Sequence, residues 1–218
     1  KEMASSDIAP YAVDRIHKAP IRDIYMFGRR GPVEAAFTNV ELREMGNLEN
    51  SVPEIDVAQL PAEVKPDGLS DRDFRLKQKN IETMRGFSAV PRDGKAKRVH
   101  FVFYASPLEI LGGERVEGVR MERTKVESGR AIGTGVTFDI PCGLVITCIG
   151  SRAEPIDGVP FDPRKGIVVN DKGRVRPGLY AAGWVKRGAS GTIGTNKTDA
   201  DDVADLLVAD VEPVGKPG

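Results

Sequence analysis

The stretch GLYAAGWVKRGASGTIGTNKTDA, residues 178–200, holds the pattern that decides the fold of this chain. It opens with an apolar run at 179–182 that favours a short strand, and it then turns at Trp184. Glycines recur next at spacing three: Gly188, Gly191 and Gly194. A helix is expected from about residue 192 to 211. A strand, a glycine-rich turn and a helix N-terminus together form a seat for an anion or a cofactor.

The overall composition excludes several classes of protein. The 218 residues are 40% hydrophobic and 29% charged, and the formal net charge is zero. Such a balance gives no argument for nucleic acid as a partner, and no apolar run reaches the roughly 18 residues of a membrane span. Cys142 and Cys148 share one apolar stretch and are expected to be two buried thiols of a reducing compartment. The chain begins KEMASSD, without an initiator Met, so we expect the middle of a longer protein.

The N-terminal region has the element order of an α/β protein. Residues 6–17 have helical spacing, with Ser6 or Asp7 as the cap, and residues 21–27 favour a strand. That strand ends in GRRGP, residues 28–32, and a second helix is expected to begin at Pro32. Loops at the carboxyl end of a parallel strand are the expected ligand face.

A basic helix is expected in the next region. After a connector with a strand candidate at 54–57, residues 70–85 have a helical pattern. Residues 71–98 hold nine Lys and Arg against four acids. Such a run is either a solvated face or a docking surface for an acidic partner, and the local sequence leaves both open.

Residues 98–140 are expected to form a three-stranded antiparallel meander, with strands at 98–105, 115–125 and 135–140. His100 lies in the first of these, at an edge or facing solvent, and lacks neighbours at metal-ligand spacing.

The following region is expected to cross from one domain to another. GLVITCIG, residues 143–150, is continuously apolar and β-branched, which predicts a central parallel strand buried on both faces. Residues 151–160 would be a linker at a domain boundary. Residues 166–169 and 174–175 would then pair as a hairpin.

Chemistry-bearing motifs are few. Neither G-x-G-x-x-G nor G-x-x-x-x-G-K-[ST] occurs, and the only histidines, His17 and His100, support no catalytic triad. The adjacent Arg29 and Arg30 at a strand end could grip a phosphate in a bidentate manner, or they could be surface arginines.

Several motifs together resemble the adrenodoxin reductase family, the flavin-dependent NADPH:ferredoxin reductases that include the mycobacterial ferredoxin reductases. They are GRRGP (28–32), AAFT (35–38), ELRE (41–44), the run 144–150, and 178–199. The broader disulfide-reductase-like flavoproteins usually have Asp where this chain has Trp184. This chain has Ala189-Ser190 where the family often has Pro-Thr, and Ser151 where it often has Tyr.

The resemblance implies an α/β fold with two dinucleotide-binding, Rossmann-like domains of the glutathione-reductase type, each three-layered and each only partly present. Residues 1–150 would be the C-terminal part of an NADP-binding domain, with the meander at about 98–140. Residues 151–218 would be the returning segment of an FAD-binding domain. The chain would be the C-terminal half, and the N-terminal half with both glycine fingerprints would lie upstream or on a second chain.

The resemblance also implies roles for individual residues. NADP would be bound by Arg29 and Arg30 at its 2′-phosphate and by Glu41 and Gly191 towards its nicotinamide end. FAD would be contacted by Trp184, Gly191, Thr192 and Ile193, where a helix N-terminus stabilises the negative charge of a reduced flavin. By local sequence alone, Glu41 would be an exposed helix residue and Trp184 a core residue.

The implied activity passes electrons from NADPH through FAD to a ferredoxin or adrenodoxin-type iron–sulfur protein. A docking surface for that protein would include Arg72, Arg75, Lys77 and Lys79. The location would be the bacterial cytoplasm, or the mitochondrial matrix in a eukaryote, and this chain alone would be inactive.

Two alternatives stay open. One is another two-dinucleotide-fold reductase, similar to the glutamate synthase small subunit, and the other is a non-catalytic fragment that binds a partner or a nucleotide.

Overall fold

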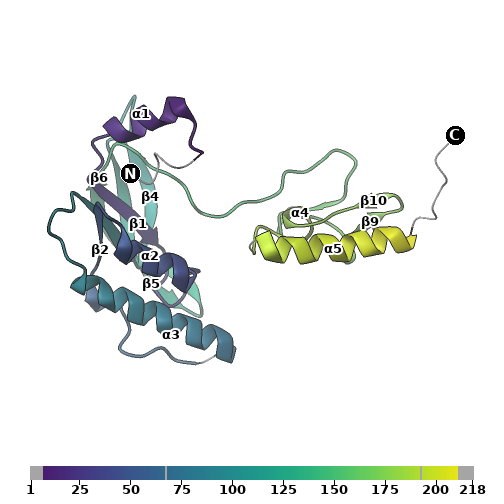
Figure 1. The fold of residues 1–218 in the computed structure, drawn as a ribbon, viewed down its shortest axis with the longest axis horizontal. Coiled ribbons are helices and arrows are strands. Elements are labelled where there is room, and N and C mark those ends of the chain that lie inside the picture. Colours follow the sequence, from purple (N-terminus) through teal and green to yellow (C-terminus); the bar gives the residue numbers. More distant parts are fainter. Residues whose placement is uncertain (1–6, 67, 192, 211–218) are drawn as a thin grey trace. The chain divides into compact units, whose positions relative to one another are not determined.

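The structure is a computed structural model that describes residues 7–66, 68–191 and 193–210. It divides into two units, residues 1–145 and residues 146–218. The first unit contains a parallel sheet with helices and a separate antiparallel sheet, and the second contains two small hairpin sheets and two helices (Figure 1). The division falls within the apolar stretch that begins at Gly143.

A three-stranded parallel sheet is the centre of the first unit. Its strands stand in the order β1 (Asp23–Gly28), β3 (Lys97–Phe103), β2 (Ser51–Ile55). Alternate residues of β3 point to opposite faces, so Val99, Phe101 and Phe103 share one buried face. Pro53 lies in β2, at the edge of the sheet, where a proline removes no ladder hydrogen bond from a second neighbour.

Two helices cover the aromatic face of this sheet, α2 (Asn39–Asn47) and α3 (Asp71–Gly86). Leu42 from α2 and Met84 from α3 are buried against Phe101 and its neighbours. The expected helix at 70–85 is confirmed, with Ser70 as its cap: the Ser70 hydroxyl accepts the backbone N–H of Asp73 at 3.1 Å. Two 3₁₀ turns, η2 (Val57–Gln59) and η3 (Phe87–Ala89), follow β2 and α3.

The first helix, α1 (Pro10–Lys18), begins later than expected. Proline occupies its first turn, and Ala9 at the cap position provides no side-chain hydrogen bond. Asp7 is therefore not its cap, and Ser6 lies outside the described residues. None of the residues of α1 is buried.

The antiparallel sheet contains β4 (Ala105–Leu111), β5 (Gly118–Glu127) and β6 (Arg130–Pro141). The expectation that residues 98–105 start this meander is wrong, because β3 pairs in parallel with β1 and β2. The missing strand is β4, whose Pro107 lies at a register shift and hides the strand pattern. A second core forms where Val102 and Phe27, on the other face of the parallel sheet, pack against Ala105 and its neighbours.

The predicted central strand at 143–150 is also wrong. None of these residues is in a strand, and Leu144, Ile146 and Ile149 are 64%, 74% and 90% exposed. A strand needs a hydrogen-bonded neighbour, and the described part of the chain offers no strand partner to this segment. The expectation of buried thiols fails for the same reason, since Cys148 is exposed and Cys142 half-buried, both of them free.

The second unit is built from short elements. They are β7 (Phe161–Asp162), β8 (Ile167–Val168), β9 (Arg174–Arg176), β10 (Leu179–Tyr180), α4 (Trp184–Arg187) and α5 (Ile193–Asp210). The expected hairpin between 166–169 and 174–175 is wrong, because β8 pairs with β7 and β9 pairs with β10. The turn between them is present: the Asn170 amide oxygen accepts the Gly173 N–H at 2.9 Å.

Contact between this turn and α5 fixes the middle of the second unit. A methyl group on Gly173, which has a positive φ of 114°, would stand 2.7 Å from Val203 of α5. Glycine is therefore required there for both its backbone conformation and its size. On α5 itself, Val203 is buried, whereas Leu207 is 43% exposed.

Candidate functional site

The arginine pair lies at the carboxyl end of β1, in a segment that we call the arginine loop, residues 28–32. Arg29 is exposed and Arg30 half-buried, while Gly31 and Pro32 are buried beneath them. Among the described residues neither arginine forms an ion pair with a carboxylate, and Arg30 makes one long hydrogen bond, from Nη1 to the Gly129 carbonyl at 3.4 Å. The two guanidinium groups are therefore free to bind an anion at this edge of the sheet.

The chain after the arginine loop is not the helix that Pro32 predicted. Residues 32–34 form a turn, and helix α2 begins only at Asn39. Polar contacts from α3 hold the intervening segment in place: Lys77 Nζ donates to the Ala35 carbonyl at 2.6 Å, and the buried Asn80 amide donates to the Phe37 carbonyl at 3.0 Å. These tertiary contacts satisfy backbone carbonyls that a helix would have used internally.

Glu41 lies at the start of α2 as part of a capping box. The Thr38 hydroxyl accepts the Glu41 N–H at 3.3 Å, and the Glu41 carboxylate accepts from the Thr38 hydroxyl at 2.7 Å and the Thr38 N–H at 3.4 Å. The T-x-x-E spacing of 38–41 is the sequence signal for such a cap, and it would have placed the helix start correctly. Glu41 therefore has a structural role whatever it binds.

The four basic residues expected at a docking surface differ in their surroundings. Arg72, Arg75 and Lys79 are exposed on α3. Lys77 is half-buried and directed at the segment that follows the arginine loop. Burial lowers the pKa of Lys77, and the positive charge of Arg30 lowers it further, whereas Glu34 and Asp73 oppose the shift.

The second candidate region is the glycine turn, residues 183–191. Gly183, Gly188 and Gly191 have φ values of 64°, 95° and 86°, a conformation that side chains with a Cβ rarely adopt. Trp184, the first residue of α4, is 49% exposed, so it is not a core residue. Thr192 lies outside the described residues. Ile193 is the first residue of α5.

Asp199 anchors the glycine turn to α5. Its carboxylate accepts the Gly183 N–H at 2.5 Å and the Lys186 ammonium at 2.8 Å, and Arg187 Nε lies 3.8 Å away. The hydrogen bond from Lys186, then that from Gly183, holds the pKa of Asp199 below its ordinary value of 3.8, although burial acts in the opposite direction. The sequence alone does not predict this role, because Lys186 and Asp199 are 13 positions apart and no local pattern links them.

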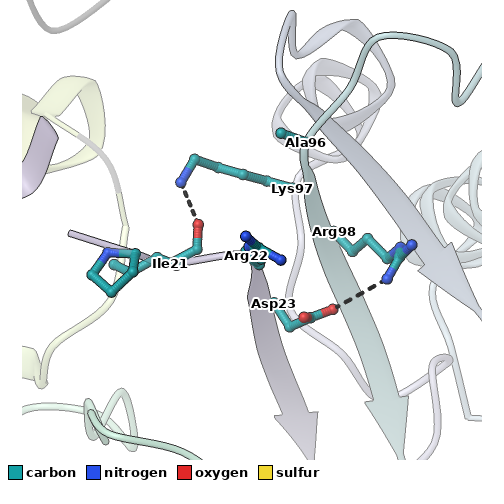
Figure 2. A pocket seen from close by; sticks show the side chains of 7 residues that line it. Ile21, Arg22, Asp23, Ala96, Lys97 and Arg98 are labelled. Atoms are coloured by element: carbon teal, nitrogen blue, oxygen red, sulfur yellow. Dashed lines mark hydrogen bonds and ion pairs between the residues drawn. The ribbon is translucent and has the colours of Figure 1, made fainter. Parts of the chain in front are cut away.

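A hollow at the opposite end of the sheet is unrelated to the arginine loop. Figure 2 shows it at the amino ends of β1 and β3, lined by residues 20–23 and 96–98. Two of its cations already have partners: Lys97 donates to the Ile21 carbonyl, and Arg98 lies 3.9 Å from Asp23. The third, Arg22, makes no side-chain hydrogen bond or ion pair among the described residues, and a single unpaired arginine does not by itself indicate a ligand site.

His100 lies in β3, the central strand of the parallel sheet, and has a structural role. Its Nε2 lies 2.8 Å from Asp23 and its Nδ1 3.4 Å from Glu54, and its ring stacks on Tyr25 with centroids 4.5 Å apart. The imidazole thus bridges all three strands. No group of three or more metal-binding side chains occurs within residues 7–66, 68–191 and 193–210.

Comparisons with known proteins agree on one family, although no family model matches the chain. NADPH-ferredoxin reductase FprA of Mycobacterium tuberculosis is 39% identical over 94% of this chain, and the mitochondrial NADPH:adrenodoxin oxidoreductase of Arabidopsis thaliana is 36% identical over 97%. The solved structure of M. tuberculosis FprA in complex with NADPH superposes with a TM-score of 0.81 at 38% identity, over 94% of this chain. Over almost its whole length, the chain is homologous to about half of these adrenodoxin reductase-like ferredoxin reductases.

The similarity to the FprA structure confirms the fold class expected from the sequence, a Rossmann-like α/β fold. The chain spans about half the length of the curated relatives it matches, 46% of the mycobacterial protein and 48% of the plant protein. Within the described residues no helix is both long and apolar enough to cross a bilayer.

The anchoring role of Asp199 predicts how the second unit responds to acid. Because its folded pKa is lowered, the ionised carboxylate contributes stability that is complete above pH 3.8 and is lost as the pH falls below it. We expect Asp199→Asn to unfold more easily near pH 7 and to lose less of its remaining stability on acidification. Urea unfolding followed by the fluorescence of the single tryptophan, Trp184, measures this unit directly.

The control for this experiment is Asp201→Asn, at an exposed position on the same helix. It should follow the wild-type curve. An Asp199→Asn profile parallel to wild type from pH 7 to about pH 2.5 would show that the lowered pKa does not contribute to stability.

Proposed function

We propose that this chain carries the NADP 2′-phosphate site and the flavin-ring site of an NADPH:ferredoxin reductase. The observation that carries the proposal is the arginine loop: two adjacent guanidinium groups that have no carboxylate partner within the described residues, at the carboxyl end of a parallel strand. Guanidinium groups recognise phosphate through paired charge-assisted hydrogen bonds, which suits the adenosine 2′-phosphate of NADP(H). Relatives named as NADPH-ferredoxin and NADPH:adrenodoxin reductases support the choice.

For the nicotinamide end, we assign Glu41 from α2 and Gly191 from the glycine turn. The Glu41 carboxylate is exposed, and both of its bonds to Thr38 use Oε2, so Oε1 has no hydrogen bond among the described residues. Gly191 offers a backbone without a side chain, to which a planar ring can approach closely.

The glycine turn suits FAD by the same physical criteria. Trp184 offers a half-exposed aromatic face, and α5 begins at Ile193, shortly after Gly191 in the sequence; the first N–H groups of a helix have no partner within the helix. Bound there, the flavin would accept two electrons as hydride and release them singly. The chain's own part would be to hold the ring and to stabilise negative charge on it through the α5 dipole.

We assign residues 1–150 to an NADP-binding domain and residues 151–218 to the returning segment of an FAD-binding domain. The parallel sheet with α2 and α3 supports the first assignment, and the strand, glycine turn and helix of the second unit support the other. The remaining half of both domains would be supplied by the same polypeptide or by a second chain. The relatives occur in bacteria and mitochondria, so the bacterial cytoplasm or the mitochondrial matrix is the proposed location.

The proposed partner is an acidic ferredoxin or adrenodoxin-type iron–sulfur protein. Arg72, Arg75 and Lys79 project from α3 into solvent, and none of them forms an ion pair among the described residues. Exposed cations without partners speed the encounter with an acidic protein by steering. Lys77 contributes to the same positive field but is held by the Ala35 carbonyl.

The arginine pair is tested with two small nucleotides. Adenosine 2′,5′-bisphosphate and adenosine 5′-monophosphate differ only in the 2′-phosphate, so their affinities isolate that group. For Arg29→Ala with Arg30→Ala we expect the bisphosphate to bind at least about tenfold more weakly, because each charge-assisted bond contributes on the order of 1.5–3 kcal/mol. Binding of the monophosphate should change little. Titration calorimetry or NMR of the purified chain measures both constants.

The control for the arginine-loop variant is a double variant on α1, Arg15→Ala with Lys18→Ala, which removes two exposed charges. That variant should retain the preference for the bisphosphate. Equal losses for both nucleotides in the arginine-loop variant would contradict the assignment.

Glu41 is tested by separating its charge from its cap. Glu41→Gln keeps an oxygen that can accept from Thr38, whereas Glu41→Ala loses the side-chain half of the capping box, keeps the Thr38 hydroxyl bond to the N–H of residue 41, and should cost about 0.3–1.5 kcal/mol of stability. If the charge also acts on the nicotinamide, both variants should bind NADP⁺ more weakly while Gln keeps the wild-type melting temperature. Wild-type NADP⁺ binding by Glu41→Gln would leave Glu41 with the capping role only.

The docking surface is tested through salt. Replacing Arg72, Arg75 and Lys79 with Gln should slow association of the chain with an acidic ferredoxin at low salt and flatten its dependence on ionic strength. Stopped-flow association from about 20 to 300 mM salt measures the slope. The control replaces three exposed cations outside α3 with Gln: Arg15, Lys18 and Arg130. It removes the same charge and should keep the wild-type slope. An unchanged slope in the α3 variant would exclude this surface.

A further inference from the structure

Two residues outside the arginine loop, Thr124 and Tyr104, form hydrogen bonds to its backbone. The Arg29 carbonyl accepts the Thr124 hydroxyl of β5 at 2.7 Å, and the Arg30 carbonyl accepts the Tyr104 N–H at 3.1 Å. Both carbonyls of the arginine pair are thus bonded, while both guanidinium groups remain without a carboxylate partner. The loop is fixed at its main chain and open at its side chains.

The two donors are themselves connected. The Thr124 N–H donates to the Tyr104 carbonyl at 2.8 Å, so Arg29, Thr124, Tyr104 and Arg30 form one continuous chain of hydrogen bonds. Thr124 is only 8% exposed, and a buried hydroxyl costs free energy unless it is bonded. Its bond to Arg29 is therefore an obligatory part of the structure rather than an incidental surface contact.

A β-bulge lies beside Thr124. The pairing of β5 with β6 shifts register between Glu122 and Thr124, where residues 134–136 of β6 stand against Arg123 alone on β5. Bulges disrupt the ladder locally, and they occur often beside functional sites.

Tyr104 is in a strained conformation at the junction of β3 and β4. Its φ of 54° lies in the left-handed region, which is an outlier for an aromatic residue. Its hydroxyl fills the space above Gly31, where an added Cβ would stand 2.4 Å from the Tyr104 oxygen and 2.8 Å from Glu34. Burial, aided by the charge of Glu34, raises the pKa of Tyr104, so the phenol stays neutral beside the arginines.

Strained residues of this kind persist where the surrounding structure imposes them, and they concentrate at ligand sites. We propose that Thr124 and Tyr104 are positioning residues of the arginine loop, and that they set how strongly it discriminates a 2′-phosphorylated nucleotide from one that lacks this phosphate. The inference rests on the proposed binding of NADP(H). A loop fixed before binding loses less conformational entropy when its two guanidinium groups close on a phosphate.

A purely architectural role would give a different result. If the hydrogen-bond chain only joined β5 to the parallel sheet, breaking it would lower stability and would affect all ligands alike. If it positions the arginine loop, breaking it lowers the affinity for the 2′-phosphate selectively. The ratio of the two nucleotide affinities therefore separates the two roles.

The test uses the purified chain with adenosine 2′,5′-bisphosphate and adenosine 5′-monophosphate as probes. Thr124→Val keeps the β-branched shape and removes the donor to Arg29. We expect its affinity for the bisphosphate to fall by about threefold to tenfold, the range for one lost hydrogen bond to a buried group, while the monophosphate affinity stays the same. Thr124→Ser, which retains the hydroxyl, should restore the preference.

A matched control exists in the same sheet. The Thr134 hydroxyl donates to the Arg123 carbonyl at 2.8 Å, an equivalent bond away from the arginine loop, so Thr134→Val should keep the wild-type ratio. Gly31→Ala gives an independent measurement: the added methyl group collides with the Tyr104 hydroxyl, and we expect it to reduce bisphosphate binding selectively as well. It keeps the inference testable if Thr124→Val fails to fold.

The outcomes separate this inference from the function on which it rests. An unchanged ratio in Thr124→Val and Gly31→Ala, with the ratio lost in the double arginine variant, overturns the positioning role and leaves the 2′-phosphate site intact. A wild-type chain that binds the two nucleotides equally overturns both. A ratio lost in Thr124→Val, restored by Thr124→Ser and kept by Thr134→Val supports the inference.

Discussion

The parallel pairing of β3 with β1 determines where every candidate residue of the first unit lies. β3 is hydrogen-bonded on both sides, and Phe101 at its centre packs against Phe37 and Phe87 with ring centroids 6.0 and 5.3 Å apart. This aromatic contact fixes α2 and α3 on one face of the sheet. Because strand β1 is in register with β3, the arginine loop emerges beside Tyr104, at the point where β3 ends.

The two units are stabilised in different ways. The first has two apolar clusters, one on each face of its parallel sheet. The second has few buried apolar residues and relies on carboxylates of α5: Asp199 binds the glycine turn, and Asp210 binds Arg174 and Tyr180. The Arg174–Asp210 pair is the more exposed of the two and contributes little by itself, whereas Asp199 and Lys186 are largely shielded from solvent, so the second unit depends more on the Asp199 contacts.

The sequence predicted local elements better than it predicted their pairing. Helix 70–85 and strand 21–27 follow directly from periodicity, and both are present. The partner of strand 98–105 could not be read from its alternation, because alternation fits parallel and antiparallel neighbours equally. The arginine pair was identified because its two residues are adjacent in the chain. Thr124 and Tyr104, far from it in sequence, could not be, since their contacts exist only once β5 has folded against the sheet.

Residues 143–150 show the limit of composition as a guide. A run of β-branched residues predicts a strand, but a strand is a property of two segments, and within the described residues this one has no neighbour. Its side chains stand open to water, and a short apolar segment with high β-propensity pairs with any free strand edge it meets. In a concentrated solution of the chain by itself, the free strand edge nearest to this segment is that of another copy of the chain. Self-association through this segment, rather than the free energy of folding, would then limit the concentration and the time over which the purified chain can be handled.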